Sequence, residues 1–121
     1  PKDTFFENGS GLSRNTKISP ETILSLLKVI KKHSSHQILL DALPVSGVDG
    51  TLENKYRTNL LRSRLNLKTG TLDGVSGLAG FITGLSGKEY LFIFLHNDIP
   101  DHSYKISLFR EDLLNWAVSD I

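Results

Sequence analysis

Four consecutive residues, Lys68, Thr69, Gly70 and Thr71, carry the clearest chemistry in this sequence. An ammonium group and two hydroxyls can bind a carboxylate, and a glycine leaves room for a ligand against the backbone. The backbone N–H of Thr71 can point at an acyl carbonyl as one donor of an oxyanion hole, a donor worth about 3 kcal/mol of barrier. We therefore expect residues 68–71 to form an exposed edge strand that holds a carboxylate beside a reacting carbonyl.

Two serine motifs have spacings that suit nucleophilic catalysis. Ser25 and Lys28 are spaced Ser-x-x-Lys, which on a helix places both side chains on one face. Ser13 and Asn15 are spaced Ser-x-Asn. Each motif also has a simpler interpretation, as the edge of a helix and as part of a loop.

The four histidines do not predict a metal centre. His33 and His36 have a His-x-x-His spacing, but no other histidine is near them and the chain has no cysteine, so we expect no zinc site. His96 and His102 flank a polar dipeptide, which we interpret as a solvated turn rather than a catalytic pair. No glycine motif for a dinucleotide or a phosphate is complete, so we expect no cofactor.

Composition predicts one small domain. The chain has 121 residues, 39% of them hydrophobic, which suffices for one core and not for two. Its 14 Lys and Arg nearly balance 13 Asp and Glu without a run of one sign, so we expect no nucleic-acid partner. The longest apolar run, residues 90–95, is far shorter than the roughly 20 residues of a membrane helix, so we expect no membrane span.

Helical signals dominate the first third of the chain. Ser19 suits an N-cap and Pro20 the first helical position. A second, shorter apolar stretch at residues 38–43 ends at Pro44, and residues 45–51 are rich in turn formers and predict a loop. The apolar face of the first helix is formed by Ile23, Leu24, Leu26, Leu27 and Ile30.

Strand signals follow, and then a last helix. Residues 65–70 alternate, residues 75–85 are apolar and glycine-rich, and residues 90–95 are continuously apolar, as in a strand buried on both faces. Short turns between them predict a three-stranded antiparallel sheet in an α+β fold. The closing helix places Ile106, Phe109, Leu113 and Trp116 at helical spacing, so we expect Trp116 in the core. We expect this helix, together with the helix that begins at Ser19, to cover one face of the sheet.

Four blocks of sequence carry a resemblance to a known family. They are Asn-Gly-Ser-Gly-Leu-Ser-Arg at residues 8–14, Leu-Pro-Val-Ser-Gly-Val-Asp-Gly-Thr-Leu at 43–52, Lys-Thr-Gly-Thr-Leu-Asp-Gly-Val at 68–75 and Leu-Ala-Gly-Phe at 78–81. In this order they resemble the class C low-molecular-mass penicillin-binding proteins, the D-Ala-D-Ala carboxypeptidase/endopeptidase family. The resemblance implies that residues 1–121 are a single partial domain, the C-terminal share of a penicillin-binding, transpeptidase-like domain.

The resemblance assigns roles to the Lys-Thr-Gly strand. It implies that Lys68 and Thr71 are catalytic, with the Thr71 N–H in the oxyanion hole, and that Thr69 and Gly70 bind substrate.

The resemblance also implies roles for residues outside that strand. Arg14 matches a position that lines the pocket for the donor-peptide side chain, and Leu72 and Asp73 match neighbouring pocket positions. Asp49 and Gly50 match a loop whose role we expect to be structural.

The family nucleophile does not match any residue of this chain. In the family, the Ser-x-x-Lys and Ser-x-Asn motifs precede the block at residues 8–14, so Ser25 and Ser13 lie in the wrong order and this chain alone should be inactive. The parent would be a serine-type peptidase acting on peptidoglycan peptides that end in D-Ala-D-Ala, would be acylated by β-lactams, and would work in the periplasm or outside the cell. The alternative is a non-catalytic binding module derived from that family. Because a partial domain exposes a sheet edge and helix faces, we expect a dimer or pairing with the missing N-terminal part.

Overall fold

The structure of the protein is a computed structural model that describes residues 4–97 and 103–120. Helices precede the sheet and one helix follows it. In chain order the elements are α1 (Pro20–Lys32), α2 (His36–Ala42), a 3₁₀ turn η1 (Gly50–Leu52), β1 (Leu65–Leu72), β2 (Val75–Thr83), β3 (Glu89–Asn97) and α3 (Ser103–Val118).

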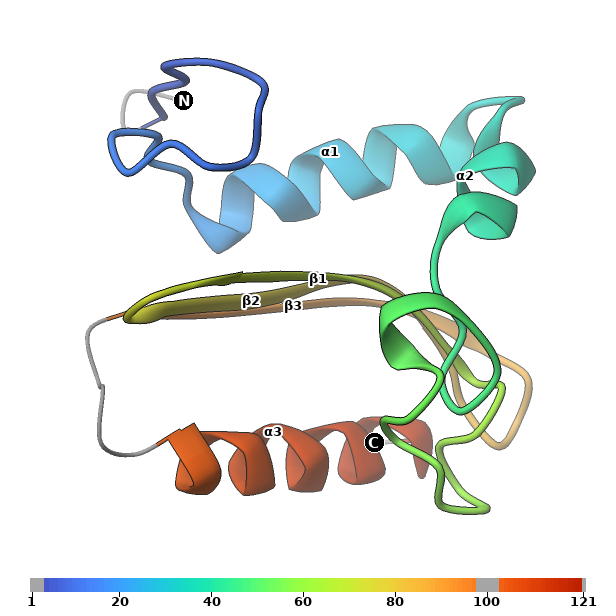
Figure 1. Ribbon diagram of the computed structural model, residues 1–121. Helices are drawn as coiled ribbons and strands as arrows, with labels where there is room; N and C mark the ends of the chain where they lie inside the picture. Colours follow the sequence, from blue (N-terminus) through green and yellow to red (C-terminus); the bar gives the residue numbers. More distant parts are fainter. Residues whose placement is uncertain (1–3, 98–102, 121) are drawn as a thin grey trace.

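The strands form one antiparallel sheet in the order β1-β2-β3, with β1 and β3 at its two edges. This confirms the predicted three-stranded meander and the α+β class. The helices lie in two layers, with α1 and α2 on one side of the sheet and α3 on the other (Figure 1). The expectation that α3 and the first helix cover the same face is therefore wrong.

Both faces of the sheet are covered because both carry apolar side chains. Side chains alternate between the faces of a strand. Leu67 and Leu78 are buried on the α3 side, in one cluster with Leu114 of that helix. The neighbouring Phe81 points to the opposite side, where the ring of His36 meets it edge-on with centroids 4.8 Å apart. A sheet with this composition needs a helix on each side.

The first helix begins where the sequence predicts. The side chain of Ser19 accepts a hydrogen bond from the Thr22 N–H at 3.2 Å, and Pro20 is the first helical residue. Leu27 is buried and Leu26 is 55% exposed, so the buried face is narrower than predicted. The apolar stretch at residues 38–43 is the second helix, α2.

The buried face of α3 differs from the predicted one. Leu114, Ala117 and Val118 are buried, whereas Phe109 and Trp116 are 58% and 59% exposed. Trp116 is therefore not a core residue. In the last turns of this helix a second set of apolar residues lies beside the predicted one, and periodicity alone does not decide which set meets the sheet.

Candidate active site at the edge of the sheet

The outer edge of β1 is closed along its first part and open along the rest. The Ser46 N–H donates to the Leu65 carbonyl at 3.0 Å, and the Leu67 N–H donates to the Pro44 carbonyl at 3.1 Å. Residues 44–46 thus pair with residues 65–67, which we call the closed half of β1. Residues 68–72, the open half, continue as an edge strand.

The register shows which backbone groups face outward on the open half. The Thr83 N–H donates to the Arg64 carbonyl, so even-numbered residues of β1 form the hydrogen-bonded pairs with β2. Odd-numbered residues direct their N–H and C=O groups away from β2, as Leu67 does toward Pro44. The N–H groups of Thr69 and Thr71 therefore point out of the sheet at the open edge.

The loop that closes the edge is held by a buried serine and an aspartate. Ser46 is fully buried, and its hydroxyl donates to the Leu61 carbonyl at 2.6 Å and accepts from the Leu65 N–H at 3.2 Å. The Asp49 carboxylate accepts from the Val45 N–H at 2.7 Å. This placement supports the structural role expected for Asp49.

Lys68 lies where the open half begins. Its side chain is exposed, and its ammonium donates to the Thr69 carbonyl at 2.6 Å, a group that faces the open edge. The Thr69 hydroxyl donates to the Thr51 hydroxyl in η1 at 3.0 Å. The ammonium and the outward Thr69 backbone thus share one short stretch of the edge.

Gly70 leaves the sheet surface bare. A Cβ added at Gly70 would meet no atom within 4 Å, and its partner across the ladder is Gly77. Around this glycine pair lies a groove of about 630 Å³ on the α1 side of the sheet, lined by Gly70, Thr71 and Leu72 together with the loop that carries Arg14. We call it the α1-face groove.

Arg14 reaches the turn between β1 and β2. Its guanidinium donates to the Asp73 backbone carbonyl at 2.7 Å, across 59 positions of sequence. The structure therefore brings Arg14, Leu72 and Asp73 together at one end of the open half. The contact to Asp73 is made through its backbone rather than its carboxylate.

The two serine motifs have different surroundings. The Ser13 hydroxyl hydrogen-bonds to Glu7, and the Asn15 amide donates to the same carboxylate at 2.7 Å. These two hydrogen bonds hold the pKa of Glu7 below its usual value. Ser13 and Asn15 thus order a loop. Ser25 and Lys28 are both exposed on α1.

The histidines of the helical region are engaged in local contacts. The Nδ1 atom of His33 accepts from the Ser35 N–H at 3.1 Å, and the Nε2 atom of His36 lies 3.6 Å from the Glu89 carboxylate. Among the residues that the structure describes, no three His, Cys, Asp or Glu side chains converge on one point. His102 lies outside the described residues.

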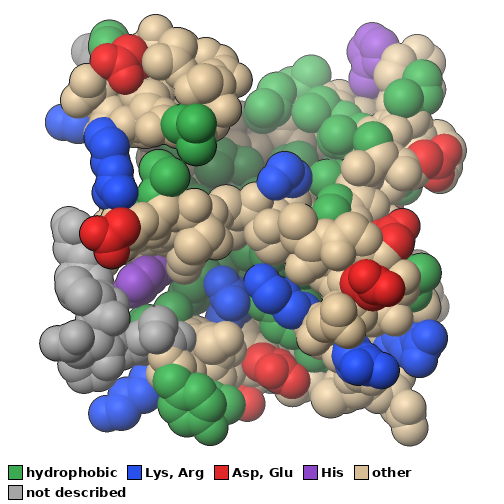
Figure 2. All heavy atoms as spheres, in the orientation of Figure 1, with side chains coloured by type: hydrophobic (Ala, Val, Ile, Leu, Met, Phe, Trp, Pro, Cys, Tyr) green, Lys and Arg blue, Asp and Glu red, His purple; other side chains and the backbone are tan. Residues whose placement is uncertain are grey.

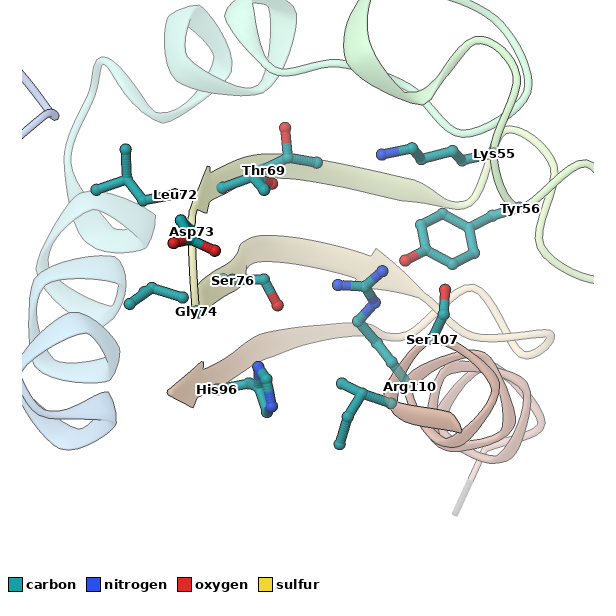
Figure 3. Close-up of a pocket in the computed structure, with 14 residues that line it drawn as sticks. Lys55, Tyr56, Thr69, Leu72, Asp73, Gly74, Ser76, His96, Ser107 and Arg110 are labelled. Carbon is teal, nitrogen blue, oxygen red and sulfur yellow. The ribbon is translucent and has the colours of Figure 1, made fainter. Parts of the chain in front are cut away.

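A second hollow lies on the other face of the sheet. This α3-face pocket, about 400 Å³, is bounded by the open half of β1, by β3, by α3 and by the loop before β1 (Figure 3). Its basic and aromatic lining is Lys55, Tyr56, His96 and Arg110. The interpretation of His96 as part of a solvated turn is wrong, because it belongs to β3 and is half-buried. Its position directly after the apolar run at residues 90–95 was the available signal. Nothing in the sequence indicated that Arg110 and Tyr56 would meet.

The comparison with protein families matches residues 2–113 to the D-Ala-D-Ala carboxypeptidase 3 (S13) family. This chain belongs to that family. Two S13 relatives are D-alanyl-D-alanine carboxypeptidase DacB of Haemophilus influenzae, 37% identical over 93 residues, and the D-alanyl-D-alanine carboxypeptidase of an Actinomadura strain, 36% identical over 95 residues. The two alignments cover 75% and 74% of this chain but 19% and 18% of the relatives, so the chain spans about a fifth of their length.

Solved structures of similar proteins show the same architecture. Penicillin binding protein 4 of H. influenzae matches with a TM-score of 0.83 and 30% identity over 95% of this chain and 27% of its own. A structure of that protein complexed with a β-lactam matches with a TM-score of 0.86 over 29% of its chain. A predatory endopeptidase of Bdellovibrio bacteriovorus, 24% identical, shares the fold with a TM-score of 0.76 over 96% of this chain and 32% of its own. No helix among residues 4–97 and 103–120 is long and apolar enough to cross a membrane.

Proposed function

We propose that this chain is the strand-bearing C-terminal part of a serine-type D-Ala-D-Ala carboxypeptidase that acts on peptidoglycan peptides in the cell envelope. The open half of β1 would bind the substrate as an added strand, a mode in which backbone groups of an exposed edge pair with a peptide. Lys68 and the hydroxyl of Thr69 would hold the terminal carboxylate. The N–H of Thr71 would donate to the oxyanion that forms when a serine outside this chain attacks the carbonyl.

One observation carries the proposal: the edge of β1 becomes open at Lys68, where the Lys-Thr-Gly motif begins. Two outward N–H groups, a cation and a bare glycine surface then lie within four residues. An edge strand with these groups is suited to an extended peptide end. Arg14 and Leu72 border the α1-face groove beside it, which would take the side chain of the donor peptide.

A β-lactam would occupy the same edge, because its carboxylate and reactive carbonyl have a placement similar to that of the peptide end. The H. influenzae relative complexed with a β-lactam supports this. The alternative is a non-catalytic module, which would bind a peptide end at the same edge but would not be acylated. Covalent labelling therefore separates the two.

The test uses a fluorescent penicillin and the full-length protein that contains this chain. We expect the full-length protein to be labelled and Lys68→Ala to reduce the acylation rate by about 10² to 10³, the usual effect of removing a group that stabilises the transition state. Lys32→Ala is the matched control, since Lys32 is exposed at the end of α1 remote from the β1–β2 turn (Figure 1).

The isolated 121-residue chain should remain unlabelled, because loss of a serine nucleophile costs on the order of 10⁶ in rate. Labelling of the isolated chain would show that a nucleophile lies within it and would direct attention to Ser25. Absence of labelling in the full-length protein would favour the non-catalytic module.

A further inference from the structure

Asn8 and Gly9 are the one asparagine–glycine pair in the sequence, and both residues are exposed. Their loop lies ahead of α1, at one end of the molecule (Figure 1). An asparagine side chain carries an electrophilic amide carbon two bonds from its Cα atom, and the backbone nitrogen of the next residue can attack that carbon. A Cβ on the next residue obstructs the attack, so glycine is the residue that permits it.

The Asn8 side chain is folded back over the loop. Its Oδ1 atom accepts two hydrogen bonds from Ser10, one from the backbone N–H at 3.0 Å and one from the hydroxyl at 2.7 Å. The first is the hydrogen bond of an Asx turn, in which the side-chain carbonyl takes the place that a backbone carbonyl has in a β-turn. The turn closes around the peptide nitrogen of Gly9 and so keeps the carboxamide carbon of Asn8 near it.

The two hydrogen bonds from Ser10 are directed at the atom that would gain charge. When a nitrogen attacks the carboxamide carbon, the Oδ1 atom becomes an oxyanion, and donors already aimed at it stabilise the transition state. A hydrogen bond to a charged oxygen is stronger than one to a neutral carbonyl. The Ser10 hydroxyl is itself held in place, because its oxygen accepts from the Leu12 N–H at 3.1 Å.

The loop leaves room for this reaction at Asn8 and not at the neighbouring asparagine. A Cβ added at Gly9 would meet no atom within 4 Å, so a ring closed onto its nitrogen meets no obstacle. The Asn15 amide, by contrast, donates to the Glu7 carboxylate at 2.7 Å, and the branched Thr16 follows it. Asn15 therefore lacks both the folded-back carbonyl and the glycine.

We infer that Asn8 is a site of spontaneous deamidation, assisted by Ser10. The Gly9 nitrogen loses its proton to solvent and forms a bond to the Cγ atom of Asn8. The bond from Cγ to the side-chain nitrogen breaks, and that nitrogen takes a proton from solvent and leaves as ammonia. Water then opens the five-membered succinimide at either of its carbonyls. One opening gives aspartate, and the other gives isoaspartate, whose main chain runs through Cβ and Cγ.

Either product changes the loop that carries Arg14. A carboxylate at position 8 adds one negative charge beside Glu7, which takes the formal net charge of this chain from +1 to 0. Isoaspartate also lengthens the main chain by one methylene group and removes the Asx turn. Gly11, Ser13 and Arg14 of the same loop line the α1-face groove, so we expect the modification to alter that groove.

The test is incubation of the full-length protein that contains this chain at neutral pH, followed by mass spectrometry of a proteolytic digest. We expect aspartate and isoaspartate at position 8, while Asn15 and Asn54, which are also exposed, stay intact over the same period. Gly9→Ala should suppress the reaction without disturbing the fold, because the added Cβ has open space. An unmodified Asn8, or a rate that Gly9→Ala leaves unchanged, would overturn the inference.

Ser10→Ala tests the assistance. It should slow the loss of ammonia about fivefold, the effect of losing one hydrogen bond that strengthens as charge develops. If the Ser10 hydroxyl only ordered the loop, its removal would free the Leu12 N–H, loosen the loop and speed the reaction instead. An unchanged or faster rate would therefore refute the role of Ser10.

Ser34→Ala is the matched control, since Ser34 is an exposed serine after α1 and its loss should leave the rate unchanged. The reaction does not depend on the proposed peptidase activity. Absence of deamidation leaves the penicillin-labelling result unaffected, and absence of labelling leaves the digest unaffected, so the two proposals fail separately.

Discussion

The N–H of Thr71 can be removed without breaking the sheet, because it faces away from β2. Proline lacks an N–H and is tolerated on strand edges at such positions. We expect Thr71→Pro in the full-length protein to lower the acylation rate by a fluorescent penicillin by about 10² to 10³, with a thermal unfolding midpoint close to the parent.

Thr71→Ala is the matched control, since it removes the hydroxyl and keeps the N–H. An equal loss of rate in Thr71→Ala would assign the effect to the side chain instead. No loss in Thr71→Pro would remove Thr71 from the oxyanion hole.

Two glycines on adjacent strands are expected to differ in how substitution by alanine affects stability and acylation. At Gly80, whose φ is +152°, an added Cβ would lie 2.3 Å from the Asn66 carbonyl oxygen, whereas Gly70 has open space. We expect Gly80→Ala to lower the free energy of unfolding by about 1–3 kcal/mol. Gly70→Ala should change stability by less than about 0.5 kcal/mol, yet obstruct the edge and slow acylation in the full-length protein. Urea denaturation measures the stabilities of the two variants. Equal destabilisation by both would contradict the finding that an added Cβ is obstructed at Gly80 and free at Gly70.

At the residue scale, the sequence could nominate one part of the candidate site but not the other. The tetrapeptide at residues 68–71 could be chosen from the sequence because it places a cation, two hydroxyls and a glycine on one strand, and its catalytic and binding roles stay predictions. The α3-face pocket could not be predicted, because Tyr56, His96 and Arg110 belong to three segments whose meeting depends on tertiary packing. Trp116 was misplaced for a related reason: the last turns of α3 also carry Leu114, Ala117 and Val118, and these residues pack in the core.

At the scale of elements, the turn between β2 and β3 is tied to the turn that follows α3 through Asp120. Its carboxylate accepts from the Ser86 N–H and from the Tyr90 hydroxyl at 3.2 Å. The hydrogen bond from the Ser86 backbone is the main reason that the pKa of Asp120 lies below its ordinary value of 3.8, and Lys88 adds to it.

This interaction predicts a pH dependence of stability. A carboxyl group with a lowered pKa in the folded state stabilises the fold above its ordinary pKa, and the stabilisation is lost as pH falls through the folded value. We expect the difference in unfolding midpoint between the parent chain and Asp120→Asn to be largest above about pH 5 and to shrink below pH 4. Taking the difference cancels the contribution of Glu7, whose pKa is also lowered. A difference that stays constant from pH 7 to pH 2 would refute the assignment.

Element prediction succeeded where short-range signals were complete. The Ser19-Pro20 start of α1 and the alternation of residues 65–70 are local, and both elements are present. The choice of sheet face for each helix is not local: it depends on both faces of β2 being apolar and on the direction in which each connection turns. This is why the sequence predicted the helices but placed α1 on the wrong face.

At the scale of the whole molecule, apolar surface remains exposed on α3 and at the β3 edge. Leu108, Phe109 and Trp116 are each more than 45% exposed, and Figure 2 shows hydrophobic side chains on the lower surface over α3. We expect the isolated chain to self-associate at tens of micromolar, because an exposed edge and apolar patches promote pairing.

Sedimentation velocity over a dilution series measures this self-association. Trp116 is the single tryptophan, so a blue shift of its emission with concentration would report burial of this face. A Trp116→Gln variant should dissociate at higher concentrations than the parent. A clean monomer at all concentrations would contradict the expected dimer.

The closure of β1 by residues 44–46 has a consequence for where a bound peptide must stop. A peptide that pairs antiparallel with the open half would run from Leu72 toward Lys68, so its C-terminal end would arrive at the Pro44–Val45 backbone. That backbone already forms hydrogen bonds with the next residues of β1, so further residues of the peptide could not pair there. If a peptide binds in this way, the closed edge would favour chain termini over chain interiors by steric exclusion, and Lys68 would neutralise the negative charge of the terminal carboxylate.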